Sequence, residues 1–362
     1  MLRKTFYEDL SNHFCGTIIS STTKQEIMDL KKIGDFNLRC IPFNKGKKVL
    51  SNIRFILWSI MYCLVLRFRK GKIHLVITYD PFKTGLIGWV CSRILDAKLV
   101  VEVNGVYTSP AVFMDEPNNF FTIVKRRAFP LIESFVLRRS AGIKLLFPEQ
   151  LVPLKKHFQD KVIHSFPCHV EIDPFLNFTG NEEKREILFA GFPFKLKGVD
   201  ILIAAFKLIS EKYPDWSLKI LGWFPDKTEL QKAIDGHPRI EVHLPVFYSE
   251  MPEHICKCSI FVLPSRTEAM GRVLVEAMAA GKPRVGANVD GIPTVINDGV
   301  DGLLFKSEDI QDLAQKLELV MEDPKLRRKM GTAGRKRAIR DFSSTVYFKH
   351  LFDFYSEVLL LK

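Results

Sequence analysis

The 362-residue sequence predicts an α/β protein with two Rossmann-like domains, each built on a doubly wound parallel sheet, that face each other across a cleft. Three observations predict this fold class. Short β-branched runs alternate with longer helical patterns along the whole chain, which is typical of βαβ units. The chain is long for a single core and suits two domains of roughly 180 residues. A polar, turn-rich stretch near 172–186 separates two halves that each contain this alternation.

The first half predicts strands bounded by turn residues and helices between them. The strands are expected at Gly16–Ser20, Asn37–Pro42, His74–Thr78, Lys98–Val103, Gly142–Phe147 and Val162–Ser165. The helices are expected near 4–13, 49–68, 84–96, 120–139 and 149–158. Within the second helix, the uncharged run from Phe55 to Leu66 is about 18 Å long, against roughly 30 Å for a bilayer core. This run therefore predicts a buried or interfacial helix and not a membrane span.

The second half repeats the pattern with more sharply bounded strands. The strands are expected at Glu186–Phe189, Ser217–Leu221, Ile240–Leu244, Ser259–Leu263, Arg284–Gly286 and Gly302–Phe305. The helices are expected at 198–212, 227–235, 249–256, 272–280, 292–296, 307–321 and 324–340, followed by a terminal helix near 344–361. The terminal helix has a wide apolar face, so we expect it to dock on another part of the protein.

Positive charge is concentrated in the first half. The chain has a net charge of +12, and residues 1–180 hold 26 Lys and Arg against 15 Asp and Glu. Three basic clusters flank apolar helical stretches: Lys45/Lys47/Lys48, Arg67/Arg69/Lys70/Lys72 and Lys125/Arg126/Arg127. Cations beside apolar helices favour contact with an anionic membrane and disfavour a nucleic acid partner.

The seven cysteines are scattered, and the close pair Cys256 and Cys258 lacks the companions that a zinc site needs. We therefore expect free thiols, no metal and a cytoplasmic protein. The first residues lack the apolar segment of a signal peptide. A peripheral position at the inner face of the cell membrane fits both the charge and the compartment.

Two glutamates eight residues apart, Glu268 and Glu276, are the main candidate functional residues. Gly271 interrupts the segment between them and predicts a loop that leads into a helix starting near Arg272. Free N–H groups at such a helix start form an anion site, above all for phosphate. Glu276 has apolar neighbours, so it is unlike the glutamates of a solvated helix face and needs a partner. Carboxylates beside a phosphate site predict a ligand with phosphates and hydroxyls.

A second group of residues follows the first strand of the second half. Gly191 permits a tight turn there, and Lys197 precedes Gly198 at a helix start, where a cation can hold phosphate oxygens. A solvated lysine before a glycine-initiated helix is the alternative. Because ligands of open α/β sheets bind beyond the carboxyl ends of the strands, this loop and the Glu268 loop should open into one cleft.

In this order, these motifs resemble the donor domain of retaining glycosyltransferases of family 4, also called group 1, which have the GT-B fold. The resemblance covers about 183–340. It is carried by Lys197-Gly198, by Glu268 and Glu276, by the turn Gly281-Lys282-Pro283, by Gly291-Ile292-Pro293 and by the segment at Gly302. It implies an N-terminal acceptor-side domain at 1–175, a donor-binding domain at 183–340, and a final segment, 341–362, that crosses back to the first domain.

The resemblance also implies a role for each matching residue. Lys197 neutralises the diphosphate of a nucleotide-sugar, Glu268 accepts hydrogen bonds from the donor sugar, and Glu276 accepts them from the ribose. The backbone around Gly271, Arg272 and Val273 holds the distal phosphate. The remaining implied donor-binding residues are Gly191, Gly198, Lys195, Arg266, Pro245 and Val246. The resemblance further implies same-face attack in which the leaving phosphate takes the acceptor proton, so that no dedicated nucleophile is needed; it also implies that no cofactor and no metal is required.

The chain departs from the family pattern in two places. Phe192 stands where the family usually has Arg, and Lys195 is a candidate replacement for that charge. The sequence also begins within the first expected helix, so the opening strand and Gly-rich loop of the family are absent from it. Either the start is truncated or that contact comes from elsewhere.

In the first half, the clearest match is the strand-end segment that contains Asn104. Asn104 is a candidate catalytic residue that orients a sugar hydroxyl, or else a turn-forming residue before Gly105. Asp80 also ends a strand and is an acceptor-side candidate. The sequence thus predicts a retaining glycosyltransferase that moves a sugar from a nucleotide-diphosphate sugar to a glycan or lipid-linked acceptor in envelope polysaccharide or lipopolysaccharide synthesis. The alternative is a catalytically silent nucleotide-sugar-binding or membrane scaffold protein. The sequence does not indicate an oligomeric state.

Overall fold

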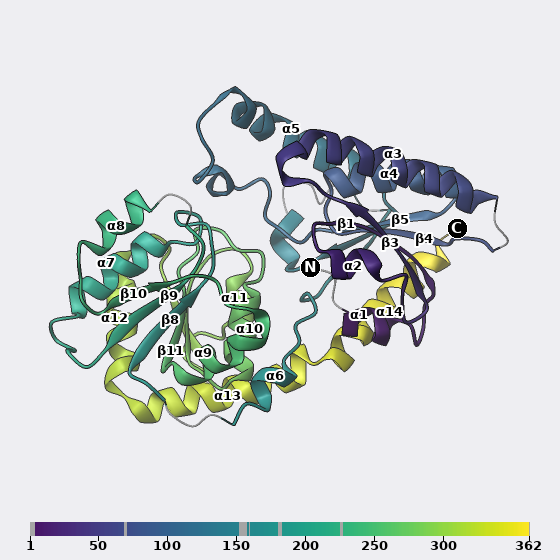
Figure 1. Cartoon of the computed structure of the whole chain (residues 1–362). Helices are drawn as coiled ribbons and strands as arrows, with labels where there is room; N and C mark the ends of the chain where they lie inside the picture. The colour runs from purple at the N-terminus through teal and green to yellow at the C-terminus, as the bar shows by residue number, and fades with distance from the viewer. Residues whose placement is uncertain are drawn as a thin grey trace.

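The computed structural model describes residues 4–68, 71–151, 158, 160–179, 183–224 and 227–361, which form two α/β domains (Figure 1). The N-terminal domain contains the first part of the chain together with the last helix, and the C-terminal domain contains the elements from β8 to α13. The chain passes between the domains twice, through α6 (Asp173–Leu176) and at the junction of α13 (Pro324–Phe342) with α14 (Ser344–Leu360). The predicted fold class, two Rossmann-like domains, is confirmed.

The N-terminal domain alternates strands and helices. Its strands are β1 (Gly16–Thr22), β2 (Lys32–Ile33), β3 (Phe36–Pro42), β4 (Leu75–Thr78), β5 (Lys98–Glu102), β6 (Gly142–Leu145) and β7 (Val162–Ser165). Its helices are α1 (Lys4–Leu10), α2 (Gln25–Asp29), α3 (Lys48–Arg67), α4 (Lys83–Leu95) and α5 (Phe120–Leu137), with 3-10 turns η1 (Lys45–Lys47), η2 (Pro110–Phe113) and η3 (Pro148–Leu151). The helix expected at 149–158 begins as η3, and its residues 152–157 lie outside the described residues.

The strands of this domain belong to two hydrogen-bonded sheets. β4, β5, β6 and β7 form a parallel sheet in that order. β1 pairs in parallel with β3, and β2 pairs antiparallel with the other side of β3; a turn at Gly34, whose φ is +54°, leads from β2 into β3. Among the described residues no strand pairing joins β1 to β4, which refines the expectation of one sheet in this half.

The C-terminal domain has one six-stranded parallel sheet with the order β10-β9-β8-β11-β12-β13. The strands are β8 (Glu186–Ala190), β9 (Ser217–Leu221), β10 (Ile240–His243), β11 (Ile260–Leu263), β12 (Arg284–Ala287) and β13 (Gly302–Phe305). Besides α6 and α13, the helices are α7 (Val199–Ile209), α8 (Thr228–Ile234), α9 (Met251–Lys257), α10 (Arg272–Ala279), α11 (Ile292–Val295) and α12 (Ile310–Glu322), with a 3-10 turn η5 (Tyr248–Glu250). The strand order reverses between β8 and β11, which is where such sheets bind ligands.

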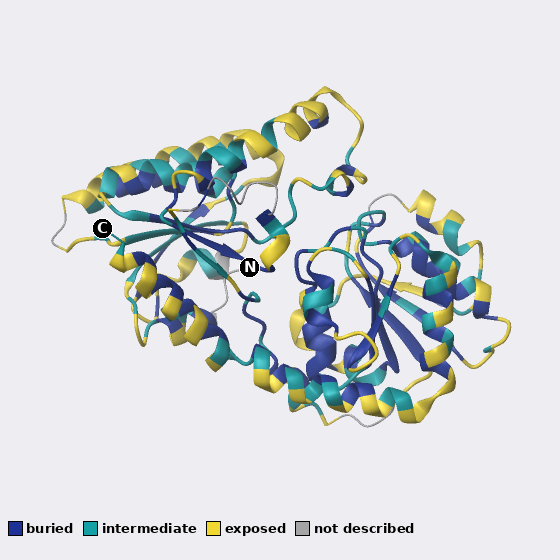
Figure 2. Ribbon diagram, turned by 180° about the vertical axis from the view of Figure 1, so that it is seen from behind, coloured by how far each residue is buried: buried dark blue, intermediate teal, exposed yellow. Residues whose placement is uncertain are grey.

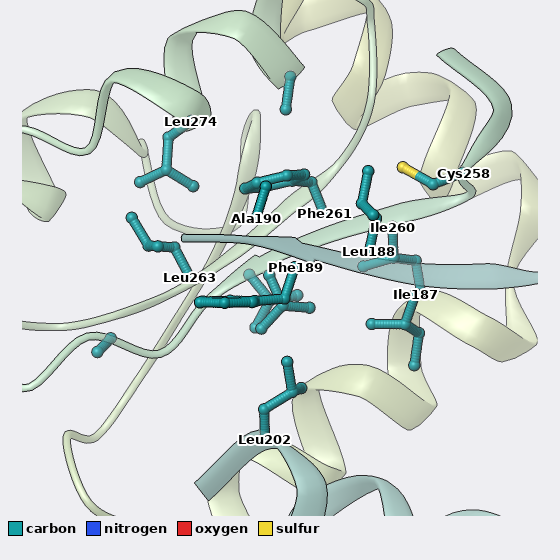
Figure 3. Close-up of a cluster of buried hydrophobic side chains, with 14 of the residues drawn as sticks. Ile187, Leu188, Phe189, Ala190, Leu202, Cys258, Ile260, Phe261, Leu263 and Leu274 are labelled. Carbon is teal, nitrogen blue, oxygen red and sulfur yellow. The ribbon is translucent and has the colours of Figure 1, made fainter. Parts of the chain in front are cut away.

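The core of the C-terminal domain is packed on both faces of β8 (Figure 3). Successive side chains of a strand point to opposite faces. Accordingly, Ile187 and Phe189 point toward Leu202 of α7, whereas Leu188 and Ala190 point to the other face (Figure 3). All five residues of β8 are buried, as expected for a central strand covered by helices on both sides. This packing makes β8 and β11 a rigid support for the loops that follow them.

The terminal helix α14 lies against the N-terminal domain (Figure 1). Its buried residues are Tyr347, Phe348, Leu351, Phe354, Tyr355 and Val358. The packing on β6 is so close that a Cβ atom on Gly142 would lie 2.5 Å from Cγ2 of Val358. The wide apolar face noted in the sequence is therefore covered by the domain that opens the chain.

Candidate active site

The loops after β8 and β11 meet at the point where the strand order reverses. Gly198 fixes their contact, because a Cβ atom at this position would lie 2.0 Å from the carbonyl oxygen of Pro264. Its φ of +65° also favours glycine. This close approach puts the side chains of Lys197 and Glu268 together.

Lys197 and Glu268 form an ion pair at the centre of this site. The distance from Nζ of Lys197 to Oε2 of Glu268 is 2.5 Å, and the two side chains are 20% and 15% exposed. The ammonium group of Lys197 can thus exchange the carboxylate of Glu268 for a phosphate of a ligand. The carboxylate of Glu268 can then accept a hydrogen bond from a hydroxyl of the same ligand. Both side chains are partly exposed, so a ligand can reach them.

The predicted helix start is in place behind this ion pair. α10 begins at Arg272, and Gly271, with φ of +73°, is the N-cap residue and supplies no side chain to cap the first N–H groups. The positive end of the helix dipole is therefore available for an anion. Glu276 lies in the second turn and is only 3% exposed, while Val273 is half-buried and Arg272 is exposed.

A third loop, which contains Asp290 and Gly291, holds the Glu268 loop in position. The carboxylate of Asp290 accepts hydrogen bonds from Oγ1 of Thr267 at 2.5 Å and from the backbone N–H of Glu268 at 3.1 Å. The N–H of Gly291 donates to the carbonyl of Glu268, and a Cβ atom at Gly291 would lie 1.8 Å from the carbonyl oxygen of Ala269. The sequence marks Gly291 as part of the family resemblance but contains no sign that Asp290 braces the loop.

Arg266 is engaged by carboxylates in this structure. Its guanidinium makes a two-pronged hydrogen bond with Asp200, at 2.8 and 3.0 Å, and a further bond of 2.9 Å to Glu308. Burial acts to lower the pKa of Arg266, but the hydrogen bonds and charges of Asp200 and Glu308 raise it above the usual value. Nζ of Lys195 lies 3.6 Å from Asp200 and 3.7 Å from Glu229. The sequence does not mark Asp200 or Glu308 as partners of Arg266. The one hint is that Asp200 closely follows the Lys197 loop in the sequence.

Phe192 and the predicted residues Pro245 and Val246 lie in loops that follow strands of the C-terminal sheet. Phe192 is 58% exposed on the loop that follows β8, one residue beyond Gly191. Pro245 is exposed and Val246 is half-buried in the segment after β10, which is an edge strand of the sheet, two strands away from β8. The predicted donor-side residues thus lie in the loops at the carboxyl ends of β8, β10 and β11 and on α10, which follows the last of these loops.

The predicted residues of the N-terminal domain end the strands β4 and β5. Nδ2 of Asn104 donates to the carbonyl of Tyr79 at 3.1 Å, which ties these two strand ends together. The carboxylate of Asp80 accepts from the N–H of Phe82 at 2.8 Å and from Oγ1 of Thr84 at 2.6 Å, so it caps the start of α4. Both groups therefore hold local structure in addition to any role toward a ligand.

The two domains contact each other directly beside the site. The carboxylate of Asp115, which follows η2, accepts hydrogen bonds from the backbone N–H groups of Lys195 at 2.9 Å and Leu196 at 2.8 Å. The N–H of Cys168 lies 3.3 Å from the sulfur of Met270 on the opposite side. Sequence analysis predicted a cleft but not these contacts across it. Among the described residues, no group of three or more His, Cys, Asp or Glu side chains is arranged to hold a metal ion.

Comparisons with known proteins connect this geometry to one enzyme class. Residues 176–337 match the family model described as "Glycosyl transferases group 1". An uncharacterized glycosyltransferase of Haemophilus influenzae is 32% identical over 162 residues, and the match covers 42% of this chain and 44% of the relative, less than half the length of either. The capsular polysaccharide biosynthesis glycosyltransferase CapM of Staphylococcus aureus is 25% identical over 375 residues, which cover 94% of this chain and 90% of CapM.

A solved structure shows that the likeness extends to the fold of both domains. The chain superposes on Anabaena Alr3699/HepE in complex with UDP and glucose with a TM-score of 0.76 at 14% identity, covering 98% of this chain and 94% of that protein. At this identity the likeness shows the fold alone. The match over the C-terminal domain supports the predicted enzyme class, glycosyltransferase. The chain therefore has the GT-B fold, and its residues 176–337 resemble the group 1 glycosyl transferases.

Proposed function

We propose that the protein is a retaining glycosyltransferase that moves a sugar from a nucleotide-diphosphate sugar to a glycan or lipid-linked acceptor. The observation that carries this proposal is the Lys197–Glu268 ion pair beside the uncapped start of α10. A cation, a positive helix end and a hydrogen-bond acceptor are the three groups that a diphosphate joined to a sugar requires.

Donor binding would rearrange the ion pair. Lys197 moves from Glu268 to the diphosphate, and the released carboxylate of Glu268 accepts hydrogen bonds from the sugar hydroxyls. Glu276, one turn into α10, accepts hydrogen bonds from the two ribose hydroxyls, which a single carboxylate can do. The backbone from Gly271 to Val273 holds the distal phosphate.

The transfer step breaks the bond between the anomeric carbon and the phosphate oxygen, and the electron pair stays on the diphosphate. Lys197 and the start of α10 stabilise this growing negative charge. The acceptor hydroxyl forms the new bond on the same face, and its proton passes to the departing phosphate oxygen. Asn104 and Asp80, at the strand ends of the other domain, are the candidates that orient the acceptor.

Two comparisons support the substrate classes. The HepE structure is a complex with UDP and glucose, and the name of CapM refers to capsular polysaccharide. We therefore propose UDP-sugars as the first donors to test and an envelope polysaccharide or lipopolysaccharide as the product class. A cytoplasmic enzyme that acts on a lipid-linked acceptor works at the inner face of the membrane, which fits the basic N-terminal domain.

A panel of UDP-, GDP-, ADP- and TDP-sugars, read by thermal shift, tests the donor site. The matching nucleotide-sugar should raise the melting temperature of the wild type by mass action, and Glu276→Gln should abolish this rise. The surface variant Glu211→Gln, exposed after α7, is the matched control and should retain it. No shift with any donor would refute the proposal. Binding without transfer or hydrolysis would favour a silent scaffold, the alternative that the exposed Phe192 supports.

A further inference from the structure

Helix α3 is fixed along the domain surface by one narrow face. Its buried residues, Ser51, Phe55, Ser59 and Cys63, recur every fourth position and form a single stripe that faces α4. Nζ of Lys83, at the start of α4, donates to Asn52 at 2.8 Å and lies 4.5 Å from the ring centre of Phe55. The contact therefore extends over most of the helix.

The opposite face of α3 is apolar and exposed. Eight large apolar side chains point to solvent along it and just beyond its end: Val49, Leu50, Ile53, Leu57, Met61, Leu64, Val65 and Phe68. Leu57 is 59% and Met61 is 61% exposed, in the middle of the helix. α3 runs along the outer edge of the N-terminal domain (Figure 1), and the ribbon along this edge includes exposed segments (Figure 2). A continuous apolar stripe of this length on a soluble domain indicates a binding surface.

By length and composition alone, residues 45–67 could also cross a membrane, and only 22% of their most apolar window is buried. The buried stripe excludes a perpendicular span in this fold, because α3 would have to separate from α4 to cross a bilayer. A helix held by one face and apolar on the other lies in the plane of an interface.

The charges around the stripe select an anionic partner. From Phe36 to Tyr79 the sequence contains nine Lys and Arg but no Asp or Glu. Lys45, Lys47 and Lys48 are exposed at one end of α3, and Arg67 and Lys72 at the other. Arg69 and Lys70 of the second cluster lie outside the described residues. Cations at both ends of an apolar stripe match the phosphates and acyl chains of an anionic leaflet.

A groove along α3, from its start to Met61, has both cationic and apolar side chains in its lining. Its volume is about 830 Å³, and Lys47, Leu50, Arg54, Leu57, Trp58 and Met61 contribute to its lining. Two cationic groups thus stand beside apolar side chains, as an amphiphile with a phosphate head requires. Because α3 follows the carboxyl end of β3, this end of the helix lies on the side of the domain that faces the C-terminal domain (Figure 1).

We propose that α3 docks the protein on an anionic phospholipid leaflet, with its axis in the membrane plane and lipid phosphates at the cations of its two ends. This deepens, and in that sense rests on, the membrane contact included in the proposed function. It also fits a lipid-linked acceptor, because the first turn of α3 lies on the side of the N-terminal domain that faces the C-terminal domain (Figure 1). Vesicle binding is measured without any sugar donor, so its failure and the failure of glycosyl transfer are separate results.

Cosedimentation of the full chain with vesicles tests this proposal. The protein should pellet with phosphatidylcholine vesicles that contain phosphatidylglycerol and stay in solution with phosphatidylcholine alone. Binding should weaken as salt rises, because the cations are screened. The variant Lys47→Gln/Lys48→Gln should bind the anionic vesicles about 25-fold more weakly, since each cation near such a surface contributes about 1 kcal/mol, a factor of about five.

Apolar substitutions separate insertion from simple charge attraction. Leu57→Asp/Met61→Asp should abolish binding to the anionic vesicles. Leu319→Asp, which changes a residue on α12 that is 49% exposed, is the matched apolar control and should bind like the wild type. Lys325→Gln/Lys329→Gln, in the exposed basic turns of α13, is the charge control. Because all of these positions are exposed, the variants should keep the wild-type circular dichroism spectrum.

A depth measurement completes the test. Lipids with brominated acyl chains should quench the fluorescence of Trp58, and the part of the quenching due to this residue should disappear in Trp58→Phe. Equal loss of binding in the α13 control, or undiminished binding of Leu57→Asp/Met61→Asp, would overturn the proposal. So would a wild type that ignores the vesicles but dimerises through α3, seen as a mass that halves in that same variant.

Discussion

Replacing Gly198 with alanine should disrupt the contact that holds the Lys197 loop against the loop after β11. Gly198 has φ of +65°, and a Cβ atom there would lie 2.0 Å from the carbonyl oxygen of Pro264. Gly236 offers a matched control, since its φ is +68° and a Cβ atom would meet nothing within 4 Å. The two alanine variants therefore share the backbone strain and differ only in the steric clash.

The expected free energies of unfolding follow from these two effects. A left-handed conformation costs a residue with a side chain about 1 kcal/mol, so Gly236→Ala should destabilise the protein by about that amount. In Gly198→Ala the Cβ atom must gain about 1 Å from a backbone oxygen, which adds about 2 kcal/mol by analogy with overpacked sites. Gly198→Ala should thus lose about 3 kcal/mol in total, and its Lys197 should no longer meet Glu268.

Urea-dependent hydrogen exchange of the β8 and β11 amides measures this loss in the C-terminal domain alone. Nucleotide-sugar affinity should fall in Gly198→Ala and stay unchanged in Gly236→Ala, because only the first loop carries a proposed donor-binding residue, Lys197. If the two variants had equal stability within about 0.5 kcal/mol, the close approach of Gly198 to Pro264 would not exist in solution.

Three further predictions concern a buried acid, the domain contact and the proposed phosphate-binding lysine. Burial raises the pKa of Glu133 on α5 from 4.5 to about 7; the folded protein therefore binds more protons than the unfolded chain between these values, and stability falls as pH rises through this window. In urea unfolding, the free energy of unfolding of Glu133→Gln should rise relative to that of the wild type by about 3 kcal/mol from about pH 5 to about pH 8. A difference between the two proteins that does not change with pH would contradict this. Asp115→Ala should speed the hydrogen exchange of the Lys195 and Leu196 amides at least about 10-fold, because each loses a hydrogen bond to a carboxylate; unchanged exchange would show that the domains do not touch there. Lys197→Ala should lower kcat for sugar transfer by a factor of about 100, with Lys195→Ala as the milder neighbour, and equal effects of the two would assign the phosphate contact elsewhere.

Strong periodicity and glycine turns made most of the fold predictable. The strands of the C-terminal domain lie within a residue or two of their expected bounds, because each is a short buried run between turn residues. The N-terminal domain was less predictable from the sequence, because α2 and β2 are short segments without a clear apolar pattern. The separation of β1 from β4 depends on long-range pairing, which local sequence does not encode.

Some residues of the candidate site could likewise be predicted from the sequence, and others could not. Gly271, Lys197 and Glu268 were recognisable because glycine turns and charged residues follow predicted strands. Asp115 and Asp290 were not, since each acts on backbone N–H groups of a loop that is distant in sequence, and an exposed aspartate has no local signature. Arg266 was correctly placed near the site, but its engagement by Asp200 depends on the register of two loops.

The double passage of the chain between the domains restricts how they can move. Arg335 of α13 donates one hydrogen bond to the carbonyl of Leu176 at the first passage and another, at 2.9 Å, to Ala279 of α10. Arg335 therefore holds the two interdomain connections together at one edge of the molecule. Rotation of one domain relative to the other about that edge is the motion that these connections still allow. A chain anchored by α3 would then keep one half stationary, and each turnover would be a swing of the nucleotide-binding half toward a fixed surface.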